Sequence, residues 1–142
     1  MWPILSEVLA PGQPRSDQRP VRTVVCDDVR EFRLLLRLEL EDCDDIEVVG
    51  EAADGCEAVR TIRELRPDVA IVDLVMPGLD GLEVVRRVRR TQPDIRLLVL
   101  SGLHASVMAE PAVEQGADRY LEKGEPLPAL RSAVLELAGA GE

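Results

Sequence analysis

Short apolar runs alternate along the chain with longer segments in which apolar residues recur every three or four positions. The runs have the length of strands, and the early ones are rich in Val and Ile, which favour strands. The longer segments have the periodicity of amphipathic helices. This alternation predicts one α/β domain with a mostly parallel sheet, right-handed crossovers and helices on both faces. The five predicted strands lie at residues 23–26, 47–51, 69–72, 97–100 and 119–121.

Four of the five predicted helices are simple to place, at about residues 29–42, 58–65, 82–88 and 127–137. The fourth helix in chain order is harder, because Pro111 lies within residues 105–116. A proline in a helix interior costs about 3 kcal/mol, since it lacks an N–H and clashes with the preceding turn. Proline is accepted in the first turn. We therefore expect this helix to begin near Ala109 or Glu110 and to end at Gly116.

The alternating pattern occupies residues 21–139 and leaves no room for a second domain. Residues 1–20 contain four prolines, so we expect an irregular tail there. Residues 140–142 are interpreted equally well as a tail or as the start of a linker.

Composition narrows the function classes. Apolar residues make up 46% of the chain and aromatic residues only 2%, so the core must be aliphatic, as suits a parallel sheet buried on both faces. The net charge of −10 disfavours binding to a nucleic acid backbone. The one basic cluster is interpreted as the solvated face of a helix; its members are Arg86, Arg87, Arg89 and Arg90.

The cysteines and the absence of long apolar stretches indicate where the protein works. Its three cysteines form no Cys-x-x-Cys pair and accompany a single histidine, which argues against a disulfide framework or a zinc site. No apolar stretch approaches the roughly 18 residues of a membrane span. The first residues lack the features of a secretory signal. We expect a soluble, cytoplasmic protein without membrane contact.

Polar residues follow four of the five predicted strands. Asp27 and Asp28 follow the first, Asp73 the third, Ser101 the fourth and Lys123 the fifth. The carboxyl ends of parallel strands meet at one edge of the sheet, where the sites of such folds form. Three neighbouring carboxylates repel one another unless a cation joins them, and hard oxygen ligands suit Mg²⁺. A lysine supplies a counter-charge to an anion. The set predicts a site that neutralises a phosphoryl group while a carboxylate attacks phosphorus.

Each of these residues has a simpler interpretation when taken alone. An aspartate after a strand is often a helix N-cap, a serine there is often part of a turn, and a lysine is by default a surface charge. Their occurrence together at successive strand ends favours the phosphoryl site.

Four segments together resemble the receiver domains of bacterial two-component response regulators, over about residues 21–139. The most specific is the Asp-x-x-Met-Pro-x-x-Asp-Gly motif that begins at Asp73. The resemblance implies a doubly wound, five-stranded sheet of order 2-1-3-4-5, as in flavodoxin and CheY. The segments are residues 25–28, 72–81, 100–102 and 116–123.

The resemblance also implies roles for the residues at the strand ends. Asp73 would accept a phosphoryl group from a histidine kinase or from a small phosphodonor. Asp28, Asp73 and the backbone carbonyl of Val75 would bind Mg²⁺, and Asp27 would assist through a water molecule. Lys123 would hold a phosphoryl oxygen.

The remaining implied roles concern switching. Ser101 would bind the phosphoryl group and, as the switch hydroxyl, move towards it, and Tyr120 would turn inward after it. The face made by the fourth helix, fifth strand and fifth helix would then change, and dimerisation through this face is a further expectation. Val75 and Leu103 occupy positions that tune the lifetime of the phosphoryl group. Neither apolar side chain can orient an attacking water, so we expect self-dephosphorylation over many minutes or longer.

The sequence departs from the family pattern at Gly124, where many members carry proline. This variant is similar to receivers of the NarL/LuxR kind, which precede DNA-binding domains. Control of transcription through an output domain absent from this chain is thus expected, although a protein that stands alone is equally compatible with the ending at Glu142.

Two other functions could be built on a similar arrangement of residues. An aspartate-nucleophile phosphatase needs a second aspartate where Val75 stands. We therefore expect a phosphoacceptor that catalyses only its own phosphorylation and dephosphorylation, not an enzyme with a separate substrate. The second alternative is a receiver-like interaction module that works without phosphorylation.

Overall fold

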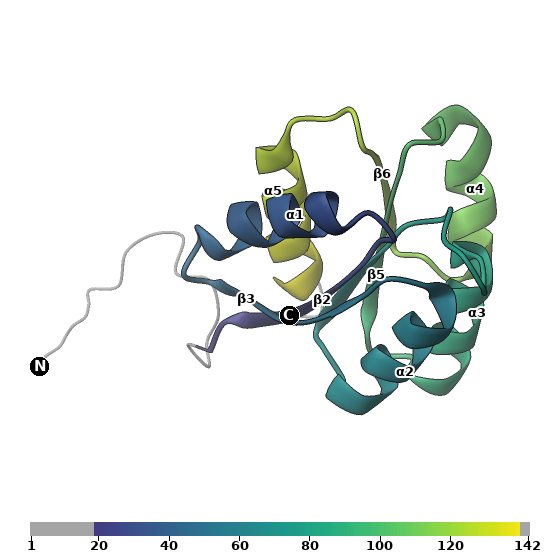
Figure 1. The fold of residues 1–142 in the computed structure, drawn as a ribbon, viewed down its shortest axis with the longest axis horizontal. Coiled ribbons are helices and arrows are strands. Elements are labelled where there is room, and N and C mark those ends of the chain that lie inside the picture. The colour runs from purple at the N-terminus through teal and green to yellow at the C-terminus, as the bar shows by residue number, and fades with distance from the viewer. Residues whose placement is uncertain (1–18, 140–142) are drawn as a thin grey trace, which may run out of the picture.

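The computed structural model describes residues 19–139, which form one five-stranded parallel sheet flanked by helices (Figure 1). The sheet order is β3-β2-β4-β5-β6, which is 2-1-3-4-5 when the strands are counted along the chain. The predicted α/β doubly wound class is therefore confirmed. Most of the predicted N-terminal tail, and residues 140–142, lie outside the described residues. The strands are β2 (Val21–Cys26), β3 (Ile46–Ala52), β4 (Val69–Val72), β5 (Arg96–Ser101) and β6 (Arg119–Glu122).

The helices lie on both faces of the sheet, α1 and α5 on one and α2, α3 and α4 on the other (Figure 1). Within residues 19–139, no helix has the length and apolar character needed to traverse a lipid bilayer. The helices are α1 (Arg30–Glu41), α2 (Gly55–Leu65), α3 (Gly81–Thr91), α4 (Ala105–Gln115) and α5 (Leu127–Gly139).

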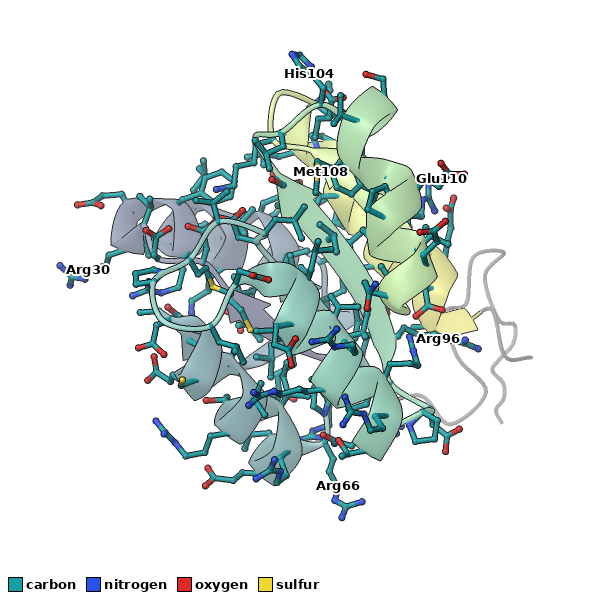
Figure 2. All side chains as sticks on the ribbon, turned by 90° about the vertical axis from the view of Figure 1, so that its right-hand side faces the viewer. Arg30, Arg66, Arg96, His104, Met108 and Glu110 are labelled. Atoms are coloured by element: carbon teal, nitrogen blue, oxygen red, sulfur yellow. The ribbon has the colours of Figure 1, made fainter. Side chains whose placement is uncertain are left out.

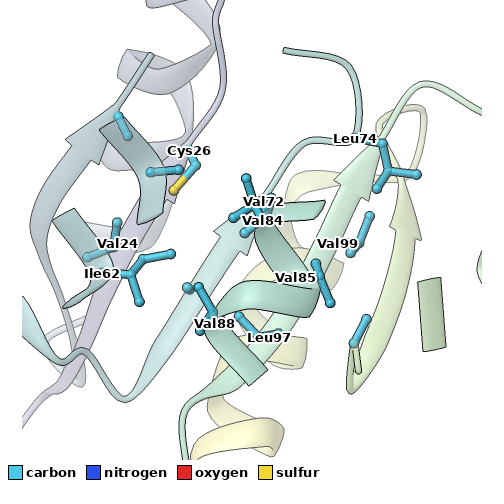
Figure 3. Close-up of a cluster of buried hydrophobic side chains, with 14 of the residues drawn as sticks. Val24, Cys26, Ile62, Val72, Leu74, Val84, Val85, Val88, Leu97 and Val99 are labelled. Carbon is cyan, nitrogen blue, oxygen red and sulfur yellow. The ribbon is translucent and has the colours of Figure 1, made fainter. Parts of the chain in front are cut away.

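Two aliphatic clusters fill the space between the sheet and its helices. All four residues of the central strand β4 are buried, because both faces of that strand are covered. On the α2/α3 side, Val72 and Leu97 of the sheet pack in one cluster with Ile62, Val84 and Val88 (Figure 3). Because aromatic residues are scarce, Val, Leu, Ile and Ala fill the core. The tightly packed sheet holds the loops at its carboxyl edge in place.

The fourth helix begins earlier than the sequence predicted. It starts at Ala105, with His104 as N-cap, so Pro111 lies in the helix interior and not in its first turn. The start is set by Glu122 at the end of β6, whose carboxylate accepts a hydrogen bond from the Ala105 N–H at 2.6 Å. A carboxylate there satisfies a free N–H and complements the positive end of the helix dipole. This contact joins residues 17 positions apart, so the local proline rule could not reveal it.

The cost of the interior proline falls on an exposed part of α4. Pro111 cannot donate a hydrogen bond to the carbonyl of the residue four positions earlier, Val107. Val107 is exposed, so water can reach that part of the helix. Figure 2 shows His104, Met108 and Glu110 along this helix. The helix ends at Gly116, as predicted, where φ is 122°.

The basic cluster of α3 is only partly a solvated face. Arg86 and Arg87 are exposed and pair with Glu83 on the same helix. Arg89 instead bonds to the carbonyl of Gly116 at 2.9 Å and to the carboxylate of Asp118 at 2.6 Å. It thereby ties the end of α3 to the entrance of β6, and the prediction of a solvated face was wrong for this residue.

Candidate functional site

Three carboxylates meet at the carboxyl edge of the sheet, at the ends of β2 and β4. The Asp27 N–H donates to the carbonyl of Ala52, and the Asp73 N–H donates to that of Cys26, each at 3.0 Å. The sheet therefore sets the backbone position of both acids. Asp27 is 2% exposed and Asp73 is 4% exposed, whereas Asp28 is exposed. One oxygen of each carboxylate lies within 4.8 Å of the others.

Lys123 reaches this group from the end of β6. Its backbone N–H donates to the carbonyl of Ser101 at 2.8 Å. Its ammonium lies 2.7 Å from Oδ2 of Asp27 and 3.2 Å from Oδ2 of Asp73. The lysine side chain is 24% exposed, so the ammonium lies between the buried acids and the solvent.

The charges of the site are only partly balanced. Burial raises the pKa of Asp73, although the Lys123 ammonium and the Val75 N–H oppose this. Burial disfavours the ammonium of Lys123, but the hydrogen bond that it donates to Asp27 and the charge of Asp73 outweigh this effect and raise the pKa of the lysine. Three carboxylates against one ammonium leave an excess of negative charge when all are ionised. The donor set is therefore suited to a divalent cation.

The loop after Asp73 owes its shape to two later residues of its motif. Asp80 caps α3 by accepting the Glu83 N–H at 3.0 Å. Gly81 donates its N–H to the carbonyl of Leu74 at 3.0 Å. A Cβ at position 81 would lie 2.3 Å from the carbonyl oxygen of Asp73 and 2.5 Å from Cα of Leu74. Glycine at this position thus lets α3 begin directly against the backbone of the candidate acceptor.

The predicted switch residues meet in the loop between β5 and α4. The side chain of Ser101 is fully buried, and its Oγ accepts the N–H of Leu103 at 3.2 Å. The Tyr120 hydroxyl donates to the carbonyl of Leu103 at 2.7 Å. One exposed loop residue is therefore held from both sides by the two residues whose predicted roles are to move.

An open cleft of about 270 Å³ lies over the acids. A Cβ at Gly102 would meet no atom within 4 Å, so the mouth is open on that side. Val75 and Leu103 are both exposed, and they give the cleft an apolar rim. The lining residues are Asp28, Asp73, Val75, Gly102, Leu103 and Lys123.

Residues 23–135 match the family model of the response regulator receiver domain. The chain belongs to this family. The predicted resemblance is thereby confirmed, including its likeness to receivers of the NarL/LuxR kind. The receiver domain is 38% identical over 122 residues to the transcriptional regulatory protein LiaR of Bacillus subtilis, which covers 86% of this chain and 57% of LiaR. It is 29% identical to the chemotaxis protein CheY of Halobacterium salinarum, covering 84% of this chain and 98% of CheY.

A solved structure agrees with these relatives. The receiver domain of the response regulator NarL from Mycobacterium tuberculosis superposes with a TM-score of 0.81 and 37% identity, covering 84% of this chain and 97% of that one. The relatives also include a protein-glutamate methylesterase of Methanospirillum hungatei, 37% identical over 82% of this chain but only 35% of its own length. The chain spans about half or less of the length of several relatives it matches, so the activities of those whole proteins are not transferred to it.

Two features of the receiver site were missed by the sequence analysis. The ring of Phe32 lies 4.5 Å from the Lys123 ammonium, measured to the ring centroid. Phe32 lies in the first turn of α1 and only four residues after Asp28, and this closeness in the sequence could have placed it near the site. The cap that Glu122 provides for α4 had no signal of comparable strength, because it depends on how β6 and α4 pack.

Proposed function

We propose that Asp73 accepts a phosphoryl group from a histidine kinase. The negative charge of this group then changes the conformation of the face formed by α4, β6 and α5. The observation that carries the proposal is the set of contacts around Asp73. This nearly buried carboxylate bonds to Lys123, lies within 4.8 Å of two further acids and lines an open cleft. Membership of the receiver family supports the same role.

The chemistry follows from the groups at the strand ends. An Oδ atom of Asp73 attacks phosphorus, so that a P–O bond forms and the P–N bond to the kinase histidine breaks. The released ring nitrogen takes up a proton from solvent, which leaves the histidine as a neutral imidazole. The Lys123 ammonium, 3.2 Å from Asp73, can bond to one of the transferred oxygens and stabilise the charge that develops there. The backbone of Asp73 is held by β2, so the acceptor needs little reorganisation.

A bound Mg²⁺ would neutralise further phosphoryl charge. Asp28 and Asp73 would hold it together with the backbone carbonyl of Val75, and Asp27 would act through a water molecule. This division of roles agrees with the contacts of the acids. Asp27 already bonds to Lys123 at 2.7 Å and to the Val29 N–H at 2.8 Å, whereas Asp28 is exposed and faces the cleft.

The switch is proposed to act through the loop between β5 and α4. Phosphorylation adds close to two negative charges and three acceptor oxygens. The Ser101 hydroxyl can donate to one of them, and that movement would break its present bond with the Leu103 N–H. Tyr120 then loses its partner at Leu103 and can turn inward, which shifts α4 against β6.

The proposal extends to lifetime and output. The apolar rim formed by Val75 and Leu103 provides no group to orient a water, so the phosphoryl group should persist for many minutes or longer. LiaR and YhcZ of Bacillus subtilis are transcriptional regulators by name, which supports control of transcription through a further domain. Dimerisation through the α4, β6 and α5 face belongs to the same proposal.

The test is the intact mass of the protein after incubation with acetyl phosphate and Mg²⁺. We expect a gain of one phosphoryl group that disappears in Asp73→Ala and without Mg²⁺. Asp94→Ala, which removes an exposed acid at the opposite edge of the sheet, is the matched control and should gain the group normally. No gain in the unmodified protein would favour the phosphorylation-independent interaction module. A half-life of seconds would contradict only the lifetime.

A further inference from the structure

We propose that the ring of Phe32 is a positioning residue for phosphoryl acceptance, because it holds the Lys123 ammonium over the acceptor. The inference rests on the proposed function of Asp73 and Lys123 and adds a residue to it. Phe32 is the only phenylalanine in the chain.

The ammonium of Lys123 has three partners. Two are the carboxylates of Asp27 and Asp73, at 2.7 Å and 3.2 Å. The third is the Phe32 ring, whose centroid lies 4.5 Å away. This separation is well within the roughly 6 Å over which an aromatic face attracts a cation. The ring therefore attracts the ammonium in addition to the two carboxylates.

The backbone around Lys123 does not by itself fix the position of the ammonium. The lysine has a long flexible side chain, and its backbone N–H bond to Ser101 fixes only the main chain before it. Gly124 follows, and a Cβ there would meet no atom within 4 Å. The turn is closed by a hydrogen bond from the Glu125 N–H to the Glu122 carbonyl at 3.1 Å, which holds the main chain but not the ammonium. A restraint on the ammonium must therefore come from side chains around it.

Phe32 can provide this restraint because its own position is fixed independently of the loop. It lies on α1 and packs against the buried cluster between α1, α5 and the sheet. Asp28 lies two residues before the first residue of α1 and lines the cleft. The start of α1 and the segment just before it thus place the ring and a metal-ligand candidate beside the same site.

The ring differs from the carboxylates in what happens on phosphorylation. When the Asp73 oxygen bonds to phosphorus, that carboxylate loses its charge and the ammonium has to turn to a phosphoryl oxygen. Asp27 attracts the ammonium away from this position, whereas the ring attracts it without accepting a hydrogen bond. Phe32 therefore keeps the ammonium near the acceptor while leaving its N–H groups free for the phosphoryl oxygens.

The experiment compares Phe32→Leu with Phe32→Tyr, using the rate of phosphorylation by acetyl phosphate at saturating Mg²⁺, followed by intact mass. Loss of the aromatic face in Phe32→Leu should slow the reaction about three- to ten-fold, and Phe32→Tyr should recover most of the rate. Leu35→Ala on the same helix removes an exposed apolar side chain outside the site and should leave the rate unchanged.

A double substitution separates positioning from support of the fold. In a Lys123→Gln background, Phe32→Leu should have no additional effect, because the group on which the ring acts is gone. An equal slowing in both backgrounds, or an unchanged rate in Phe32→Leu, would overturn the inference while leaving Asp73 as acceptor. Failure of the unmodified protein to gain a phosphoryl group would instead overturn the proposed function, and the role of Phe32 with it.

Discussion

Replacement of Gly81 by alanine tests whether the acceptor loop depends on close backbone contact. Two effects oppose each other at this position. Alanine favours a helix over glycine by about 0.8–1.0 kcal/mol, so a position with free space would be stabilised. The structure leaves no such space, because the new Cβ would lie 2.3 Å from the Asp73 carbonyl oxygen and 2.5 Å from Cα of Leu74.

The magnitude follows from the movement that the methyl group demands. Ordinary contact begins near 3.4 Å, so the two backbone segments have to separate by about 1 Å, and neither is a flexible side chain. Overpacking of this kind costs about 1–3 kcal/mol. With a urea m-value of about 1–3 kcal/mol/M, the unfolding midpoint should fall by roughly 1 M. Because the displaced backbone carries Asp73, phosphorylation should also slow, by up to about 100-fold for a misplacement of 1 Å.

The assay is urea unfolding combined with the acetyl phosphate reaction, with Gly139→Ala as the matched control. Gly139 lies in α5, and a Cβ there would meet no atom within 4 Å. This variant should unfold within about 0.5 kcal/mol of the unmodified protein, or be slightly more stable, and should react at the same rate. If Gly81→Ala proved as stable as Gly139→Ala, the tight contact behind Asp73 would be refuted.

Three other substitutions have defined outcomes. Because burial raises the pKa of Asp73, the stability that this group contributes is present below its unfolded-state pKa and is lost as the pH rises through the folded-state pKa. Asp73→Asn should therefore raise the free energy of unfolding, measured with urea at about pH 7 without Mg²⁺, by more than the roughly 0.5 kcal/mol typical of surface changes, and by much less at about pH 3. A free energy of unfolding that fell at about pH 7 would contradict this. For Glu51, burial is outweighed by hydrogen bonds from Arg33 and Arg37 that lower its pKa, so its stabilisation is present above the unfolded-state pKa and is lost as the pH falls through the folded-state pKa. Glu51→Gln should cost about 0.5–1 kcal/mol at about pH 7 and progressively less in acid, and a loss independent of pH would speak against the ion pairs. Glu122→Ala should cost about 1 kcal/mol and speed amide exchange in the first turn of α4, whereas unchanged exchange would show that the cap is not needed.

The sequence alone was sufficient for the strands and for the residues at their ends. Apolar runs alternating with helical segments leave few arrangements other than a parallel sheet with helices on both faces. In such a sheet all strands end at one edge, so the spacing of Asp27, Asp73 and Lys123 along the chain was enough to bring them together. The specific motif around Asp73 could be interpreted locally, since Asp80 caps the next helix and Gly81 starts it.

The tertiary structure decided the features that depend on which surfaces face each other. Pro111 indicated a late start of α4, but the cap from Glu122 starts the helix at Ala105. Likewise, Lys123 was predicted near the acids, yet its closer bond to Asp27 than to Asp73 and its contact with the Phe32 ring depend on how the start of α1 and the residue after β6 meet at the carboxyl edge of the sheet. The physical reason is the same in both cases. Patterns along the chain report local preferences and burial, whereas a contact between side chains on separate elements depends on distances that arise only when the elements pack.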